Sequence, residues 1–236
     1  MKKQLLLSGL CIMLSGCDNV TPSVSFAPEM ASFSNEFDFD PLRGPVKTFT
    51  QTLISEEGKV EKRVSGTLSE EGCFDTLELL DLEHNSVVAL ILDANYYLDA
   101  ETLEKKIRLQ GNCQLAELPA AGLVWEMNDK EFLTRASGKN IRIEYRYDNE
   151  GYPIGKTSTK AEAVFAVNLQ PSTDPLKKLD YTAQQTFNGK AIGSSKQYCD
   201  YDKFANPVSC ELVMIDESVK PTVERLYTIK YDIEYY

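Results

Sequence analysis

Apolar and polar residues alternate along most of the chain, and the alternation is clearest in two stretches. From Ile141 to Asp148, isoleucine and tyrosine alternate with arginine, glutamate and aspartate. From Tyr227 to Tyr235, tyrosine and isoleucine alternate with threonine, lysine, aspartate and glutamate. Because successive side chains of a strand point to opposite faces, each stretch predicts a β-strand with one apolar face. The second predicts that the C-terminus is an integral strand.

Shorter alternating runs, separated by clusters of Gly, Asn, Asp and Pro, predict further strands. They are Val46–Ile54, Val60–Leu68, Phe74–Leu82, Val87–Leu92, Lys106–Leu109, Ala163–Leu169, Thr182–Phe187 and Val208–Met214. Residues 123–138 allow two interpretations. Asn128 to Glu131 resembles a capping box of a helix that Gly138 would end, whereas Leu123–Met127 and Phe132–Arg135 fit two strands. The pattern predicts an all-β fold, an antiparallel meander of hairpins forming a large twisted sheet or half-barrel, with one short helix as an option.

Three turns share a spacing, in which an aromatic residue and Asp are followed by four residues and then Pro. They are Tyr147–Pro153, Tyr201–Pro207 and, more loosely, Phe39–Pro45. The spacing is typical of a hairpin corner in which the Asp side chain accepts backbone N–H groups. Gly or Asn then takes a left-handed conformation, and Pro re-enters extended structure. These turns resemble the Tyr-Asp repeats of bacterial β-meander and Rhs-type proteins.

The N-terminus carries a secretory signal. Two lysines precede a mostly apolar run from Leu5 to Leu14, which is too short to span a bilayer as a mature helix. Leu14-Ser15-Gly16-Cys17 resembles the lipobox of bacterial lipoproteins. That resemblance implies that the Cys17 thiol receives a diacylglyceryl group, that the signal is cut before Cys17, and that the freed amine is acylated. Three acyl chains exceed the two signals that stable membrane anchoring requires.

The residues after the lipidated cysteine predict location and domain organisation. Asp18 and Asn19 resemble the inner-membrane retention signal of lipoproteins of enteric bacteria. We therefore expect a lipid-anchored protein on the periplasmic face of the inner membrane. The predicted divisions are a removed signal at 1–16, a lipidated N-terminus and flexible Pro/Ser-rich tether at 17–37, and one periplasmic β domain at 38–236.

The whole chain resembles the YnfC family of small lipoproteins of enteric bacteria. The resemblance rests on the leader, the sequence from Leu14 to Asn19 and the Tyr-Asp turns. It implies the cellular location of the protein and no activity.

The composition excludes some classes of binding partner. The 236 residues carry a net charge of −11, and loss of the two signal-peptide lysines takes it to −13. Nucleic acid and anionic lipid surfaces would repel such a chain. The expected partners are the membrane, through covalent lipid, and an envelope protein.

The cysteines predict two disulfides. Cys11 leaves with the signal and Cys17 is lipidated, so four remain in an oxidising compartment. Four cysteines allow three pairings. We favour Cys199 with Cys210, which flank the turn at 201–207, and Cys73 with Cys113 by elimination. The chain has no C-x-x-C and a single histidine, so we expect no metal and no cofactor.

Two motifs resemble catalytic elements. Gly151–Thr157 ends in Gly-Lys-Thr like a phosphate-binding loop, but it is one residue short and follows a hairpin turn, so a structural turn is favoured. His84 is the sole histidine and would be the natural general base, yet its acidic turn favours a surface residue.

Carboxylate pairs at Asp38/Asp40 and Asp200/Asp202 are spaced to share a strand face, roughly 7 Å apart, as a glycosidase pair would be. Turn stabilisation is the favoured role for these acids.

Three functions follow, of which the first is favoured. In the first hypothesis, the protein is a non-enzymatic interaction or envelope-accessory lipoprotein that presents a polar sheet face or edge. Alternatively, it carries an apolar ligand in a half-barrel, which an apolar cavity of several hundred Å³ would support. A hydrolase using paired carboxylates would show two acids in one cleft with raised pKa values.

Overall fold

The described part of the chain forms a closed antiparallel β-barrel of 16 strands with one α-helix inside it. The computed structural model describes residues 23–236. Each strand pairs with its neighbours in sequence, and β1 pairs with β16. The helix is α1 (Pro28–Phe37). The strands are β1 (Val46–Ser55), β2 (Val60–Leu68), β3 (Phe74–Asp81), β4 (Ser86–Asp93), β5 (Tyr96–Asp99), β6 (Lys105–Gln110), β7 (Gln114–Leu118), β8 (Leu123–Met127), β9 (Leu133–Ser137), β10 (Ile141–Tyr147), β11 (Pro153–Lys160), β12 (Ala163–Pro171), β13 (Tyr181–Phe187), β14 (Lys190–Tyr201), β15 (Pro207–Asp216) and β16 (Val223–Tyr235), with a short 3-10 turn at Pro119–Ala121.

The barrel is complete, so the prediction of an open sheet or half-barrel is wrong. The ladder between β1 and β16 runs from Val46 opposite Tyr235 to Ser55 opposite Tyr227. The all-β class and the C-terminal strand are confirmed. Closure leaves the sheet without a free edge, because barrels pair every strand on both sides. Docking of a partner along a sheet edge, one form of the interaction hypothesis, is therefore not available in the described chain.

Residues 123–138 form two strands, so of the two interpretations the helical one is wrong. Asn128 makes the turn between β8 and β9 instead of starting a helix. Its side-chain oxygen accepts the backbone N–H groups of Lys130, at 2.9 Å, and Phe132, at 3.1 Å. Glu131 takes a left-handed conformation with φ of 67°. A capping residue thus stabilises a hairpin here, because the same side chain can bond turn and helix N–H groups.

The helix lies at Pro28–Phe37, where the sequence predicted tether. The tether prediction is wrong for these ten residues. Pro28 occupies the first turn, where its missing N–H costs nothing, and Asp38 ends the helix in a left-handed conformation. All residues from Met30 to Asn35 are buried. A helix buried on every side cannot rest on the outside of a sheet, so the barrel must enclose it.

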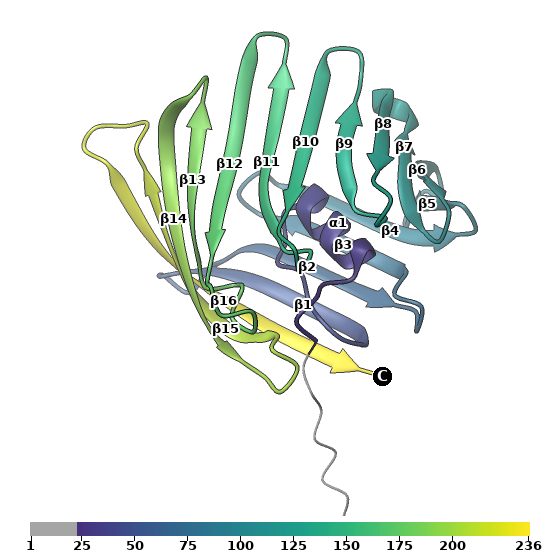
Figure 1. The fold of residues 1–236 in the computed structure, drawn as a ribbon, viewed down its shortest axis with the longest axis horizontal. Helices are drawn as coiled ribbons and strands as arrows, with labels where there is room; N and C mark the ends of the chain where they lie inside the picture. The colour runs from purple at the N-terminus through teal and green to yellow at the C-terminus, as the bar shows by residue number, and fades with distance from the viewer. Residues whose placement is uncertain (1–22) are drawn as a thin grey trace, which may run out of the picture.

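Different faces of α1 contact different parts of the wall. Met30 and Phe33 join the largest apolar cluster, which β1 to β10 supply. Ala31 packs with Phe26 and Tyr152 in a second cluster. On a third face, Ser34 and Asn35 border a cavity. In Figure 1 the helix lies between the strands β8 to β14 and the strands β1 to β4 behind them. The helix therefore fills one side of the lumen and leaves the other side open.

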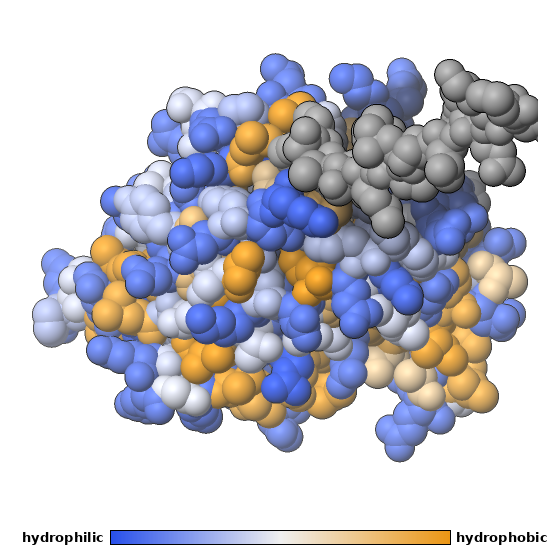
Figure 2. All heavy atoms as spheres, turned by 90° about the horizontal axis from the view of Figure 1, so that it is seen from below, coloured by the Kyte–Doolittle hydropathy of each residue, from blue (hydrophilic) through white to orange (hydrophobic). Residues whose placement is uncertain are grey.

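The outer face of the barrel is mostly polar, with some exposed apolar side chains such as Val124 and Val208. On β10, Arg142, Glu144 and Arg146 are exposed while Tyr145 is buried, as the alternating pattern predicted. The face seen in Figure 2 is mostly hydrophilic, with apolar residues in separate groups. Within residues 23–236, no helix is both long and apolar enough to cross a bilayer.

Two of the three predicted corners form as expected. The Asp148 side chain accepts the N–H groups of Glu150 and Tyr152 at 3.0 and 2.9 Å. Asp202 does the same for Phe204 and Asn206 at 2.8 and 2.9 Å. In the first corner the left-handed residue is Gly151, as predicted, whereas in the second it is Ala205 and not an Asn.

The third predicted corner, Phe39–Pro45, is not a hairpin turn. It is the segment that leads from the helix into β1, so its Asp has no adjoining strand whose turn it could stabilise.

The structure contains two disulfides in the pairing favoured from the sequence. Cys199 lies directly opposite Cys210 in the β14–β15 ladder, with Cα atoms 4.0 Å apart. Cys73 bonds Cys113, with Cα atoms 5.8 Å apart, and joins the turn after β2 to the turn after β6.

Candidate functional site

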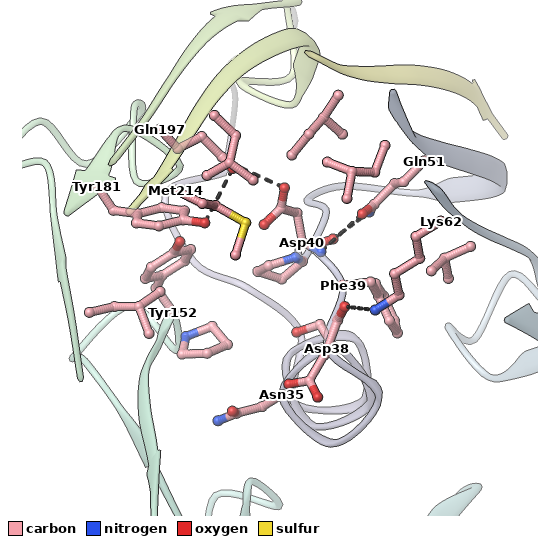
Figure 3. A pocket seen from close by; sticks show the side chains of 18 residues that line it. Asn35, Asp38, Phe39, Asp40, Gln51, Lys62, Tyr152, Tyr181, Gln197 and Met214 are labelled. Carbon is pink, nitrogen blue, oxygen red and sulfur yellow. Dashed lines mark hydrogen bonds between the residues drawn. The ribbon is translucent and has the colours of Figure 1, made fainter. Parts of the chain in front are cut away.

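A cavity of about 360 Å³ occupies the part of the lumen that α1 leaves free. Its walls come from the inward faces of β1, β2 and β11 to β16, and the C-terminal end of the helix forms one side (Figure 3). The walls are largely apolar and the polar groups gather near the helix end. The lining residues are Ser34, Asn35, Asp38, Phe39, Asp40, Pro41, Gln51, Leu53, Lys62, Val64, Tyr152, Pro153, Leu169, Tyr181, Gln197, Leu212, Met214 and Ile229.

The segment between α1 and β1 is fixed to the wall by Gln51. The Gln51 side chain accepts the Asp40 backbone N–H at 3.0 Å and donates to the Asp40 carbonyl at 2.6 Å. Gln51 is an inward residue of β1 between Phe49 and Leu53. Both backbone groups of Asp40 are thus satisfied, which orients its side chain into the lumen.

The Asp40 carboxyl lies inside the barrel and accepts hydrogen bonds from two side chains. The Tyr231 hydroxyl and the Gln197 amide, the latter at 3.3 Å, both donate to its Oδ2. Gln197 in turn accepts from the Tyr181 hydroxyl at 3.2 Å. Burial raises the pKa of Asp40, and the two hydrogen bonds and nearby Lys62 oppose that rise. The burial effect is larger, so this carboxyl holds its proton more tightly than a solvated one.

Two lysines reach the end of α1, and their partners differ. The Lys156 ammonium donates to Asp38 Oδ1 at 2.6 Å and to the Asn35 carbonyl at 3.0 Å. The Lys62 ammonium donates to the Asp38 carbonyl at 2.6 Å. Burial lowers the pKa of Lys62, against the attraction of neighbouring carboxylates. The two cations help to hold the helix C-terminus, where backbone carbonyls have no partners within the helix.

The carboxylate pairs of the hydrolase hypothesis are placed differently. Asp38 and Asp40 both border the cavity, but Lys156 binds the first and Tyr231 and Gln197 bind the second. Asp202 stabilises its turn, while Asp200 is exposed on β14. Only the first pair therefore shares a cavity, and the protein's own side chains already bind both of its carboxylates.

The other two motifs form no catalytic site, although Tyr152 and Pro153 of the Gly151–Thr157 segment line the cavity. His84 is exposed in the turn between β3 and β4, where its Nδ1 lies 2.9 Å from Asp81 Oδ2, and this bond raises the pKa of His84. Gly151 lies in a corner and the residues from Pro153 to Thr157 lie in β11, so no helix follows the Gly-Lys-Thr sequence. In residues 23–236, no three His, Cys, Asp or Glu side chains are grouped to hold a metal ion. Cys17, Asp18 and Asn19 lie outside the described residues.

Sequence reasoning missed Gln51, Lys62 and Gln197. For Gln51 and Lys62 the signal was present, because each is a polar residue at an inward position of a strand whose other inward residues are mostly apolar, whereas Gln197 shares its face with Ser195. On β2, for example, Lys62 shares the inward face with Val64 and Leu68. A polar side chain on an apolar face must find partners in the interior, and here those partners surround a cavity.

The described residues define a class of protein, a closed antiparallel barrel with an internal helix and a ligand-sized lumen cavity. Among solved structures, the fold is similar to a porin-like protein from Bacteroides uniformis ATCC 8492, with a TM-score of 0.53 and 9% identity. The match covers 81% of this chain and 98% of that one, and it shows a likeness of fold alone.

The chain belongs to UPF0257, an uncharacterised protein family whose sequence model matches residues 1–236. The protein named UPF0257 lipoprotein YnfC of Escherichia coli O127:H6 (strain E2348/69 / EPEC) is 64% identical over 236 residues, which cover all of both chains. The protein of the same name from Escherichia coli (strain K12 / DH10B) matches with the same identity and coverage. The family resemblance inferred from the leader and the turns is confirmed.

Proposed function

We propose that this protein is a lipid-anchored binding protein of the periplasm that holds a small, largely apolar molecule in the barrel lumen. The observation that supports it is the cavity of about 360 Å³, which lies within the 300–1,000 Å³ range of ligand sites. Its walls are apolar over most of their surface and its polar groups converge near the helix end, a composition typical of such sites. The cavity is bordered on one side by α1 and on the others by β1, β2 and β11 to β16, which the closed barrel brings together.

The mostly polar outer face, clearest on β10, supports a barrel that stands in water. Barrels embedded in lipid turn apolar residues outward and polar residues inward. Here β10 turns Arg142 and Glu144 outward and its tyrosines inward. In this proposal the lipid on Cys17 attaches the protein to the membrane. Asp18 and Asn19 keep it at the inner membrane.

Binding is favoured over hydrolysis because both acids at the cavity already have partners within the protein. Asp38 is ion-paired with Lys156, and Asp40 accepts from Tyr231 and Gln197. These bonds use Oδ1 of Asp38 and Oδ2 of Asp40, so a hydrolytic pair would have to act through the other oxygen of each carboxylate while its protein partners stay bound. A purely interacting protein has no need of an internal cavity, so the cavity also favours ligand binding over the interaction hypothesis.

Titration with the apolar fluorophore N-phenyl-1-naphthylamine tests the proposal. The mature chain carrying Cys17→Ala keeps every described contact and avoids detergent that would compete for the cavity. We expect saturable one-to-one binding. Met214→Trp adds bulk inside the cavity and should weaken binding at least tenfold, since overpacking leaves no room for the probe.

Val213→Trp is the matched control, because Val213 is the preceding residue of β15 and points to the outer face. It should bind like the parent, and circular dichroism should show both variants folded. Absence of saturable binding, or equal effects of the two substitutions, would reject the lumen as a ligand site.

A further inference from the structure

The cavity contains one cation that lacks a carboxylate partner. Lys62 lies on the inward face of β2, and its ammonium has a single acceptor among the described residues, the Asp38 backbone carbonyl at 2.6 Å. An ammonium carries three donors. Figure 3 shows the Lys62 side chain at the edge of the cavity, reaching toward the helix end. Two of its hydrogens therefore remain for a ligand.

The acids near Lys62 have other partners. The Asp38 carboxylate is paired with Lys156, whose Nζ is 2.6 Å from its Oδ1. Asp40 accepts from Tyr231 and Gln197. Asp81 lies across from Lys62 in the β2–β3 ladder, and its side-chain carboxylate binds the His84 ring. Each of these three acids attracts Lys62 from a distance, but none forms an ion pair with it in the described chain.

Lys62 is partly buried and has no ion-pair partner among the described residues, so a bound anion would stabilise its charge. Removing a cation from water disfavours its charged form, which is why burial lowers the pKa of Lys62. A ligand with a negatively charged oxygen would supply both the missing counter-ion and an acceptor for the free hydrogens.

The walls beyond Lys62 suit a hydrocarbon chain. Leu53, Leu212, Met214 and Ile229 line the cavity from β1, β15 and β16. Its volume lies near the lower end of the range for ligand sites, which favours one chain over two.

We infer that the lumen binds a single-chain amphiphile whose anionic oxygen head, a carboxylate or a phosphate, pairs with the Lys62 ammonium while its chain lies along β1, β15 and β16. The inference rests on the proposed function and adds the chemical class of the ligand.

Four probes with the same dodecyl chain separate the head from the chain. Dodecanoate, dodecyl phosphate, dodecanol and dodecyltrimethylammonium are titrated by calorimetry into the Cys17→Ala mature chain at pH 7, below their micelle concentrations. We expect at least one anionic probe to bind tenfold or more tighter than dodecanol, and the cation to bind weakest. The comparison of dodecanoate with dodecyl phosphate identifies the preferred head.

Lys62→Met removes the charge and keeps an apolar stem, so it should lower the affinity for the anionic probe at least tenfold and leave that for dodecanol unchanged. Lys62→Arg should retain most of the affinity. Arg63→Met is the control, because Arg63 is the next residue of β2 and points outward.

The outcomes distinguish the two proposals. If dodecanol binds as tightly as the anions, or Lys62→Met weakens all probes alike, the anionic head is wrong and lumen binding stands. If no probe binds, both proposals fail.

Discussion

Phe33→Ala tests whether the helix inside the barrel is part of the core. Phe33 is 2% exposed, stacks on Phe74 with ring centroids 4.6 Å apart and meets Tyr97 edge-on at 5.7 Å. Removing a buried phenylalanine costs about 3–5 kcal/mol, and each aromatic pair adds about 0.5–1.5 kcal/mol beyond buried area. We expect a loss of about 4 kcal/mol in the free energy of unfolding.

Urea unfolding of the disulfide-intact Cys17→Ala chain measures that loss. Trp125 is 3% exposed in the same apolar cluster as Phe33, so its fluorescence reports on the core. With a slope of about 2.5 kcal/mol per M, the midpoint should fall by about 1.5 M. Phe187→Ala is the control, because Phe187 is 46% exposed at the end of β13 and should lose less than about 1 kcal/mol.

A tether and an enclosed helix give opposite results in this experiment. If residues 17–37 were a flexible tether, Phe33→Ala would leave the midpoint unchanged. A loss no greater than that of Phe187→Ala would refute the enclosed helix and the division of the lumen that creates the cavity.

Three further outcomes are expected. Replacing Cys73 and Cys113 by serine opens a loop with a sequence separation of 40 and should lower the free energy of unfolding by about 4 kcal/mol, measured in urea. Removing the disulfide inside the β14–β15 hairpin, with a separation of 11, should lower it by about 3 kcal/mol. The reverse order would contradict the loop-entropy argument. Because the folded-state pKa of Asp40 is raised, its proton stabilises the fold below the unfolded pKa of about 3.9, and that stability is lost as pH rises through the folded value. Asp40→Asn should therefore unfold at higher urea than the parent at pH 7 but not at pH 3.5, and equal differences at both pH values would exclude the raised pKa. In cells, Cys17→Ala should move the protein from the membrane fraction to the soluble periplasm, and continued membrane fractionation with normal processing would reject the lipid anchor.

Local patterns determined much of the fold. The period of two along β10 and β16 depends only on which side chains meet water, so it predicted those strands and their inward faces. The corners at Asp148 and Asp202 were equally predictable, because an aspartate accepting nearby N–H groups is a contact within a few residues.

The helix is intermediate between local and tertiary control. Pro28 at its start and the spacing of Met30, Phe33 and Phe37 were available as signals. Other features argued against a helix. The segment contains Ser32, Ser34 and Asn35, which have low helix propensity, and it lacks a capping side chain. At ten residues it is also of a length at which isolated helices are marginal in water. Enclosure by the barrel wall supplies the stability that the local sequence lacks.

The sequence by itself determined the leader, the strands, two corners and the cysteines available for pairing. Only the tertiary structure decided that β1 meets β16, that α1 enters the lumen, and that Lys62 faces the end of the helix. Pairing between strands separated by about 180 residues leaves no local trace, because alternation specifies the faces of a strand and not its neighbour. The cavity follows from how much of the enclosed volume the helix occupies, which is a property of the assembled barrel and of no single stretch of sequence.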